Sequence, residues 1–276
     1  MTSRRTHEAG HVEAWQDRLG PYAVGVQLPH AEGAEVGRHV DNAILSLDHR
    51  VDLARPVGPP KLSPSDLARA QAQTLSQSRL RHDPVTAVLV AVVNLIYGRR
   101  ASLTKFKVLE MLAPVPYQAW ERVAYRALTR LHRYTSLARR VFDAVVEARA
   151  QQDNEVFHLL VLEELLQAQG TEQGGFRYRF LPRLMAFPYR LLVWSLLLAH
   201  PAWSYRLNSS FEDHAEHEYM AFVAAHLELE DQPFQSQAAA DYGTYNSVAE
   251  VLRQIGHDER VHKLQSMAAH PASRVR

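Results

Sequence analysis

Apolar side chains recur every three to four residues along most of the chain after residue 62, and this spacing predicts helices. Four long segments carry the pattern, approximately residues 102–134, 136–169, 202–230 and 245–269. A helix start precedes them at "SPSD", where Ser63 suits the N-cap, Pro64 the first position and Asp66 the first turn. No segment alternates apolar and polar residues as a strand would. The pattern predicts an all-α fold in which four long amphipathic helices form a bundle.

The first 62 residues differ from the rest. Gly and Pro recur there, at Gly20-Pro21, Pro29, Gly33 and Pro59-Pro60, and the apolar periodicity is weak. We therefore expect an irregular N-terminal arm over 1–62 and one helical domain over 63–276.

Two runs, 85–97 and 187–203, are apolar nearly all round. Neither reaches the roughly 18–20 residues that span a bilayer. They fit either two buried helices or two helices lying in a membrane interface, with Arg and Trp at headgroup level. No apolar segment typical of a secretory signal occurs in the first thirty residues.

Composition narrows the chemistry. Of 276 residues 46% are hydrophobic, there is no Cys, and the formal net charge is +1. The lack of Cys excludes disulfides, thiol catalysis and Cys-bound metals, and the near-neutral charge gives no reason to expect a nucleic-acid partner. A metal would have to be held by His, Asp and Glu, which suit iron, manganese or zinc.

A polar pair stands inside the apolar run "DNEVFHLL", where Glu155 and His158 share one face of a helix. A buried carboxylate needs a hydrogen-bond network, a cation or a metal. The pair Glu259 and His262 repeats the same spacing in the fourth helical segment. With 18 Glu and 15 His, about one such pair is expected by chance, whereas three occur.

The other two helical segments each carry a lone Glu among apolar residues, Glu110 in the first and Glu212 in the third. The order is therefore Glu, Glu-x-x-His, Glu, Glu-x-x-His, one element per helix. This is the ligand set of a di-iron or di-manganese carboxylate site inside a four-helix bundle. The alternative is a network of core polar groups that His and Arg neutralise.

The third pair, Glu8 and His11, lies in "HEAGH", which also matches the His-Glu-x-x-His motif of zinc proteases. That motif needs a packed helix, a third ligand and a cleft. Here it stands near the terminus, contains Gly10 and precedes the Gly/Pro-rich arm, so we expect it to be incidental.

Several neighbours of the four Glu are ambiguous. Glu216, beside His214 and His217, is one turn after Glu212 and fits a rival ligand, a base near the metal or a solvated face. Tyr219 shares the face of Glu212 and fits either a core tyrosine or a donor of an electron and a proton. Two further polar residues, Asn154 and Asp258, each precede a Glu-x-x-His pair, which suggests that they orient the ligands.

These residues resemble the alternative oxidases, membrane-bound di-iron quinol oxidases with plastid terminal oxidases as relatives. The stretch "LEMLAPVP" is similar to the family's Leu-Glu-Thr-Val-Ala-x-Val-Pro, and "NEVFHLL" to Asn-Glu-Arg-Met-His-Leu. The third, "FEDHAEHEY", is similar to Leu-Glu-Glu-Glu-Ala-x-x-x-Tyr, and "HDERVH" to Ala-Asp-Glu-x-x-His. The likeness covers about residues 83–268. It departs at Val156, Asp213 and His214, and at the bulky "YQAWER" after the first motif.

The resemblance implies a ferritin-like bundle with two iron ions, and extra helices lying on the membrane surface. It implies that Tyr219 is redox-active and that Lys105 and Leu109 lie near the quinol. The implied metal ligands are Glu110, Glu155, His158, Glu212, Glu259 and His262.

The expected activity is oxidation of a membrane quinol coupled to reduction of dioxygen to water. The expected location is a membrane surface, the cytoplasmic face of the inner membrane if the chain is bacterial, with a homodimer left open. A di-iron oxygenase or desaturase acting on another apolar substrate, a ferritin-like iron-handling protein and a membrane-surface protein with a degenerate site are the alternatives.

Overall fold

A computed structural model describes residues 58–171 and 175–269. Within them all regular structure is helical, and the only β-type pairing is one bridge between Pro233 and Ser247. The predicted all-α class is confirmed. The motif "HEAGH" and residues 1–57 of the predicted arm lie outside the described residues.

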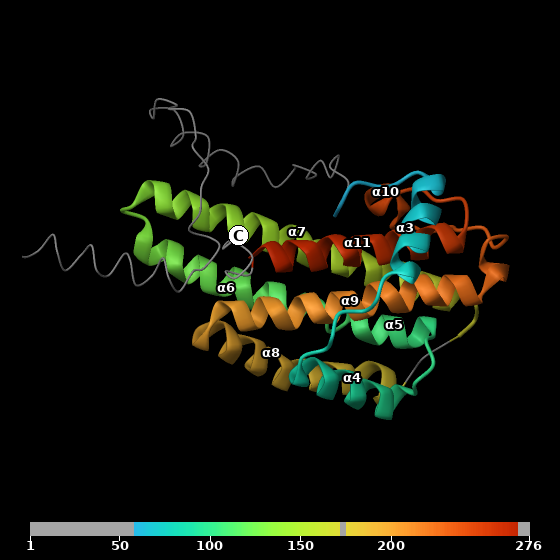
Figure 1. Ribbon diagram of the computed structural model, residues 1–276, viewed down its shortest axis with the longest axis horizontal. Coiled ribbons are helices and arrows are strands. Elements are labelled where there is room, and N and C mark those ends of the chain that lie inside the picture. The colour runs from blue at the N-terminus through green and yellow to red at the C-terminus, as the bar shows by residue number, and fades with distance from the viewer. Residues whose placement is uncertain (1–57, 172–174, 270–276) are drawn as a thin grey trace, which may run out of the picture.

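The helices (Figure 1) are α3 (Pro64–Ser76), α4 (Pro84–Tyr97), α5 (Leu103–Glu110), α6 (Pro114–Leu131), α7 (Thr135–Ala168), the π-helix η2 (Phe176–Phe180), α8 (Leu181–Ala199), α9 (Pro201–Ala225), the 3-10 helix η3 (Leu227–Leu229), α10 (Ala239–Tyr242) and α11 (Val248–Ala269).

The long helices pack in pairs. Helix α9 runs along α11 and α6 along α7, while α5 packs on α7. Helices α4 and α8 lie together along the lower edge of Figure 1, where α8 packs on α6 and α9. The core that α4 and α8 share with their neighbours includes Tyr189, Val193 and Leu112. This arrangement directs the ligand-bearing faces of α5, α7, α9 and α11 toward a shared interior.

The first predicted segment, 102–134, is not one helix. It divides into α5 and α6 at Met111–Ala113. Pro114 has no N–H to donate to the carbonyl of Glu110, and the ring of Pro116 is incompatible with a helix continuing from Leu112. Glu110 is therefore the last residue of α5. The break directs the chain into α6, which begins with Pro114 at its first position.

The other predicted helices are close to those found. Helix α7 spans Thr135–Ala168, against the predicted 136–169. The third segment is shorter than expected, because α9 ends at Ala225 and a 3-10 turn follows. Ser63 caps α3 as predicted, since its side chain accepts a hydrogen bond from the Asp66 N–H.

The second apolar run, 187–203, belongs to two helices. Helix α8 ends at Ala199 and Pro201 opens α9, so Ala202 and Trp203 lie on α9. Helix α8 also begins earlier than the run, after the π-turn Phe176–Phe180. The helical stretch Phe176–Ala199 is, among the described residues, the one long and apolar enough to cross a membrane.

Candidate metal centre

The six predicted ligands come together in the interior of the molecule. One comes from the end of α5, two from α7, one from α9 and two from α11. Each is at most 3% exposed, so water does not solvate these groups. They are Glu110, Glu155, His158, Glu212, Glu259 and His262.

The six residues form two overlapping groups in which the ligand atoms lie within 4.8 Å of one another. One group adds Glu110 and His158 to the pair Glu155 and Glu259, and the other adds Glu212 and His262 to the same pair. Each shared carboxylate has two oxygens, so it can bind one ion with each. The arrangement is therefore suited to two neighbouring metal ions with two bridging carboxylates and one Glu and one His at each end.

The Nδ1 atoms of the two histidines face the shared carboxylates. In His262 this nitrogen is 2.7 Å from an oxygen of Glu155, and in His158 it is 3.1 Å from an oxygen of Glu259. Even so, both Nδ1 atoms and both carboxylate oxygens of Glu155 and Glu259 are buried without a hydrogen bond. Buried polar atoms are rarely left in this condition, and cations held by the two overlapping groups would satisfy all six of them.

The same chain neutralises another buried acidic group differently. Asp213 and Glu216 on α9 also lie close together with His217. There the Nζ of Lys263 is 3.0 Å from Asp213 and also pairs with Glu216, and the Nε of Arg260 is 2.8 Å from Glu216. Protein cations already compensate this cluster, so Glu216 is neither a rival ligand nor on a solvated face. Glu216 also accepts a hydrogen bond of 2.6 Å from the hydroxyl of Thr74 on α3.

The four predicted carboxylate ligands have no Lys or Arg partner among the described residues. The ion pairs found there join them only to His158 and His262. An unpaired buried ion costs on the order of several kcal/mol. Two divalent cations would balance four ionised Glu beside two neutral His. The donor set thus fits two divalent metal ions, and carboxylate with imidazole suits iron or manganese.

Without a metal, protons have to perform this neutralisation. Burial and the neighbouring Glu259 raise the pKa of Glu110 to about 8, and the same causes hold the pKa of Glu212 well above its usual range. Burial lowers the pKa of His262, but Glu155 outweighs it and raises the value to about 9. Protons bound to Glu110 and His262 therefore reduce the net negative charge of the group at neutral pH.

A second ring of polar residues holds His158 in place. Its Nε2 lies 3.3 Å from Asp258, which can keep the proton on that nitrogen and leave Nδ1 free for a metal. Asp258 also accepts hydrogen bonds from Asn154 at 3.2 Å, Tyr242 at 2.9 Å and Gln254 at 2.6 Å. Burial raises the pKa of Asp258, but His158 and Lys61 lower it to about 2. The predicted orienting role of Asp258 therefore has a direct contact behind it, while Asn154 acts through Asp258.

The segment before α3 completes this ring. Lys61 lies 3.3 Å from Asp258, and its ammonium is 3.7 Å from the centre of the Tyr242 ring. Gly58 has φ +90°, and a Cβ there would come within 2.2 Å of the Asn154 amide. Only glycine combines that backbone conformation with so close an approach.

Two tyrosines contact Glu110 and Glu212, the two outer carboxylates, each of which belongs to only one of the two ligand groups. The hydroxyl of Tyr219 donates to Glu110, and its ring stacks on Phe106 with centroids 4.2 Å apart. The hydroxyl of Tyr117 donates to Glu212 at 2.7 Å and accepts a hydrogen bond from Asn208 at 3.0 Å. Sequence reasoning placed Tyr219 on the face of Glu212, whereas its hydroxyl reaches the Glu of another helix.

Tyr117 was missed, although a signal for it exists. It follows Glu110 by seven residues, as Tyr219 follows Glu212 by seven. Each tyrosine contacts the carboxylate of the other pair. The repeated Glu-x6-Tyr spacing therefore belongs to an approximate two-fold arrangement, in which the two halves of the site exchange hydroxyl groups.

The two residues expected near a quinol lie on α5. Lys105 is buried and donates to Asn94 of α4 at 2.5 Å, and Leu109 is buried in the core. Neither lines the apolar cavity of about 190 Å³ between α4, α8 and α9, whose walls include Leu112, Tyr189 and Phe211. The structure thus gives Lys105 a contact that joins α5 to α4.

That cavity nevertheless lies next to the metal ligands. Leu112 comes two residues after Glu110, and Phe211 directly precedes Glu212. Burial raises the pKa of the Tyr189 phenol, and the nearby carboxylate of Glu212 raises it further. The cavity wall therefore includes sequence neighbours of two predicted ligands, and Glu212 lies near its Tyr189.

A scan against protein-family models and a search of curated proteins found no match to this chain.

Proposed function

We propose that this chain is a di-iron carboxylate oxidase of the alternative oxidase type, a ferritin-like four-helix bundle that lies on one membrane leaflet. The observation that carries the proposal is the pair of overlapping ligand groups, which share Glu155 and Glu259 and contain buried oxygens and nitrogens without hydrogen bonds. The order of the four motifs along the chain, as in alternative oxidases, is the second support.

The reaction would take two quinols and one dioxygen to two quinones and two waters, so that four electrons and four protons balance. Two bound iron ions would supply the exchange of electrons with dioxygen. Glu155 and Glu259, which belong to both groups, would help to hold both ions, and Glu110 with His158 and Glu212 with His262 would supply the remaining ligands. Tyr219 can give up its hydroxyl proton and an electron, since its hydroxyl already lies against Glu110.

The membrane contact rests on the exposed face of α8. Its side chains Leu184, Phe187, Leu191 and Leu198, with Phe180 just before it in η2, are between 49% and 62% exposed. Successive members are three, four or seven residues apart, so they lie along one side of the helix. A row of large apolar groups in water is unfavourable, and an interfacial helix is a common reason for one. On α4, Leu95 is 86% exposed, which extends the apolar surface.

One observation favours a different substrate. The cavity beside Glu212 is almost entirely apolar, and of its lining residues only Tyr189 carries a polar group. A quinol has two hydroxyls to bind, whereas a hydrocarbon chain has none. A di-iron oxygenase or desaturase acting on a lipid chain is therefore the second candidate. A soluble iron-handling shell fits less well with the exposed apolar face of α8 and α4.

The test measures iron and oxygen uptake together. Purified protein should contain about two iron atoms per chain and consume oxygen when a quinol is added. The double variant Glu155→Ala/Glu259→Ala should lose the iron and the activity. Protein that holds no iron, or a double variant with unchanged iron, would refute the metal centre. Iron with no quinol-dependent uptake, but with oxygen uptake on a lipid substrate, would favour the second candidate.

A further inference from the structure

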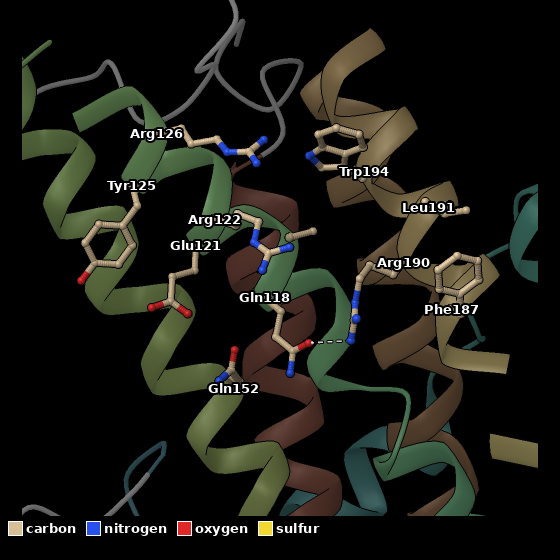
Figure 2. Close-up of a pocket in the computed structure, with 11 residues that line it drawn as sticks. Gln118, Glu121, Arg122, Tyr125, Arg126, Gln152, Phe187, Arg190, Leu191 and Trp194 are labelled. Carbon is tan, nitrogen blue, oxygen red and sulfur yellow. Dashed lines mark hydrogen bonds between the residues drawn. The ribbon is translucent and has the colours of Figure 1, made fainter. Parts of the chain in front are cut away.

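A pocket of about 820 Å³ opens on the surface between α6 and α8, and Gln152 of α7 lines it at one side (Figure 2). This is within the range of small-molecule sites. None of the six metal ligands lines it, so it is separate from the metal centre.

Three arginines extend into this space, Arg122 and Arg126 from α6 and Arg190 from α8 (Figure 2). Arg190 donates one hydrogen bond, of 3.2 Å to Gln118, and the Arg126 guanidinium is 6.0 Å from the centre of the Trp194 ring. Arg122 makes no hydrogen bond or ion pair with the described residues. Three guanidinium groups facing one pocket are suited to an anion, and arginine is well matched to phosphate.

No acidic side chain that lines the pocket is available to neutralise the three arginines. Among its lining residues Glu121 is the one acid, and Arg149 of α7 already binds it at 2.6 Å. The side-chain oxygen of Gln152, which also lines the pocket, is buried and accepts no hydrogen bond from the described residues. It could accept one from a hydroxyl of a bound headgroup.

Apart from Arg190, the wall on α8 is apolar. Phe187, Leu191 and Trp194 line the pocket and are 62%, 49% and 36% exposed. Phe187 and Leu191 belong to the exposed apolar row of α8 described above. A ligand that satisfied both walls would carry a negative group on one end and hydrocarbon on the other.

We propose that the pocket binds the phosphate headgroup of an anionic phospholipid, whose acyl chains lie along the exposed row of α8. The inference rests on the membrane contact proposed above and is independent of the metal. A second copy of the chain fits this face less well, because a symmetric interface centred on the pocket would bring the three arginines against the same three of the partner.

The test uses a monomeric short-chain lipid, so that attraction to a charged membrane surface plays no part. Full-length protein in a neutral maltoside detergent is titrated with dihexanoyl-phosphatidylglycerol and, separately, with dihexanoyl-phosphatidylcholine. We expect saturable binding of one phosphatidylglycerol per chain, about tenfold tighter than phosphatidylcholine. The variant Arg122→Gln/Arg190→Gln should lose about tenfold or more in affinity for the anionic lipid.

The matched control is Arg99→Gln/Arg100→Gln, which removes two exposed arginines after α4 and outside the pocket. It should bind as wild type does. Equal losses in both variants, or no saturation, would overturn the proposal. Inorganic phosphate binding as tightly as the lipid would also overturn it, since the apolar wall would then contribute nothing.

Folding and self-association are followed alongside. Circular dichroism checks the helix content, and the single variant Arg122→Gln serves if the double variant misfolds. A change of oligomeric state in sedimentation, with lipid binding unaffected, would assign the face to a second copy and refute the lipid. Because the titration needs neither iron nor quinol, its failure is distinguishable from failure of the oxidase proposal.

Discussion

Tyr219 and Tyr117 occupy related positions, and their surroundings predict different roles. Both donate to an outer carboxylate, but the oxygen of Tyr117 also accepts a hydrogen bond from Asn208, which itself contacts Ser266 at 3.1 Å. Tyr117 is thus held from two sides. For Tyr219 the described hydrogen bond is the one to Glu110. Tyr219 is the better candidate to release a proton and an electron.

We therefore expect Tyr219→Phe to keep its iron and its fold while quinol-driven oxygen uptake falls about a hundredfold or more, within the range for loss of a proton donor. Phenylalanine keeps the ring volume and the packing on Phe106, and the lost hydrogen bond costs about 1 kcal/mol. The matched variant Tyr117→Phe should also keep iron and should retain most of the turnover. Equal losses in the two variants would contradict the assignment of Tyr219.

The sequence was informative about residues whose positions depend on helix periodicity. Glu155 with His158, and Glu259 with His262, share a helix face whatever the fold around them, so their convergence could be predicted. The contacts of Lys61 with Asp258 and of Tyr117 with Glu212 could not, because they join residues 197 and 95 positions apart. Such contacts depend on how the helices pack. Glu216 shows the same limit, since its neutralising partners lie on α11.

At the level of helices, the break between α5 and α6 was present in the sequence as "APVP" but was hidden by apolar periodicity that continues through it. The apolar periodicity shows which face of a helix is buried, but it does not show whether the helix is continuous. The prolines determine where the helix is interrupted. Similarly, the run 187–203 is predominantly apolar throughout, although Pro201 divides it between α8 and α9.

The exposed row of α8 and the exposed Leu95 of α4 predict how the protein is retained on membranes. Wild type should pellet with membranes and resist a high-salt wash, because burial of apolar area is insensitive to screening. The variant Leu95→Gln/Leu184→Gln should be released several-fold more readily and should stay folded, since these side chains are 86% and 53% exposed. The measurement is the fraction that remains in the membrane pellet after the wash.

The control places the same change on helices away from this face. Leu160→Gln/Leu264→Gln alters α7 and α11 at side chains that are 44% and 53% exposed. Its retention should match wild type. Wild-type protein that is fully soluble without detergent would contradict the membrane contact and favour an iron-handling role.

For the whole molecule, a metal ion that binds only the folded chain should stabilise it. One site at a hundredfold excess of free metal over its dissociation constant contributes about 2.7 kcal/mol. Two sites in a chain of this size should raise the Tm by about 10 °C. Anaerobic thermal unfolding with and without Fe(II), followed by circular dichroism, measures the shift. Glu155→Gln should abolish most of it, whereas Glu216→Gln should change the Tm of the metal-free protein and leave the shift intact.

The shift should also depend on pH with a definite sign. In the metal-free protein the pKa of Glu110 is about 8 and that of His262 about 9, and those of Glu212 and His158 lie well above their usual ranges. At pH 7 Glu110 and His262 bind protons that the metal has to displace, so the loaded protein holds fewer protons than the empty one. Raising the pH from 6 to 8 at fixed free metal must then favour loading, by about tenfold in apparent affinity per pH unit for each proton released. A shift that stays constant or shrinks over this range would mean that these carboxylates and imidazoles do not bind the metal.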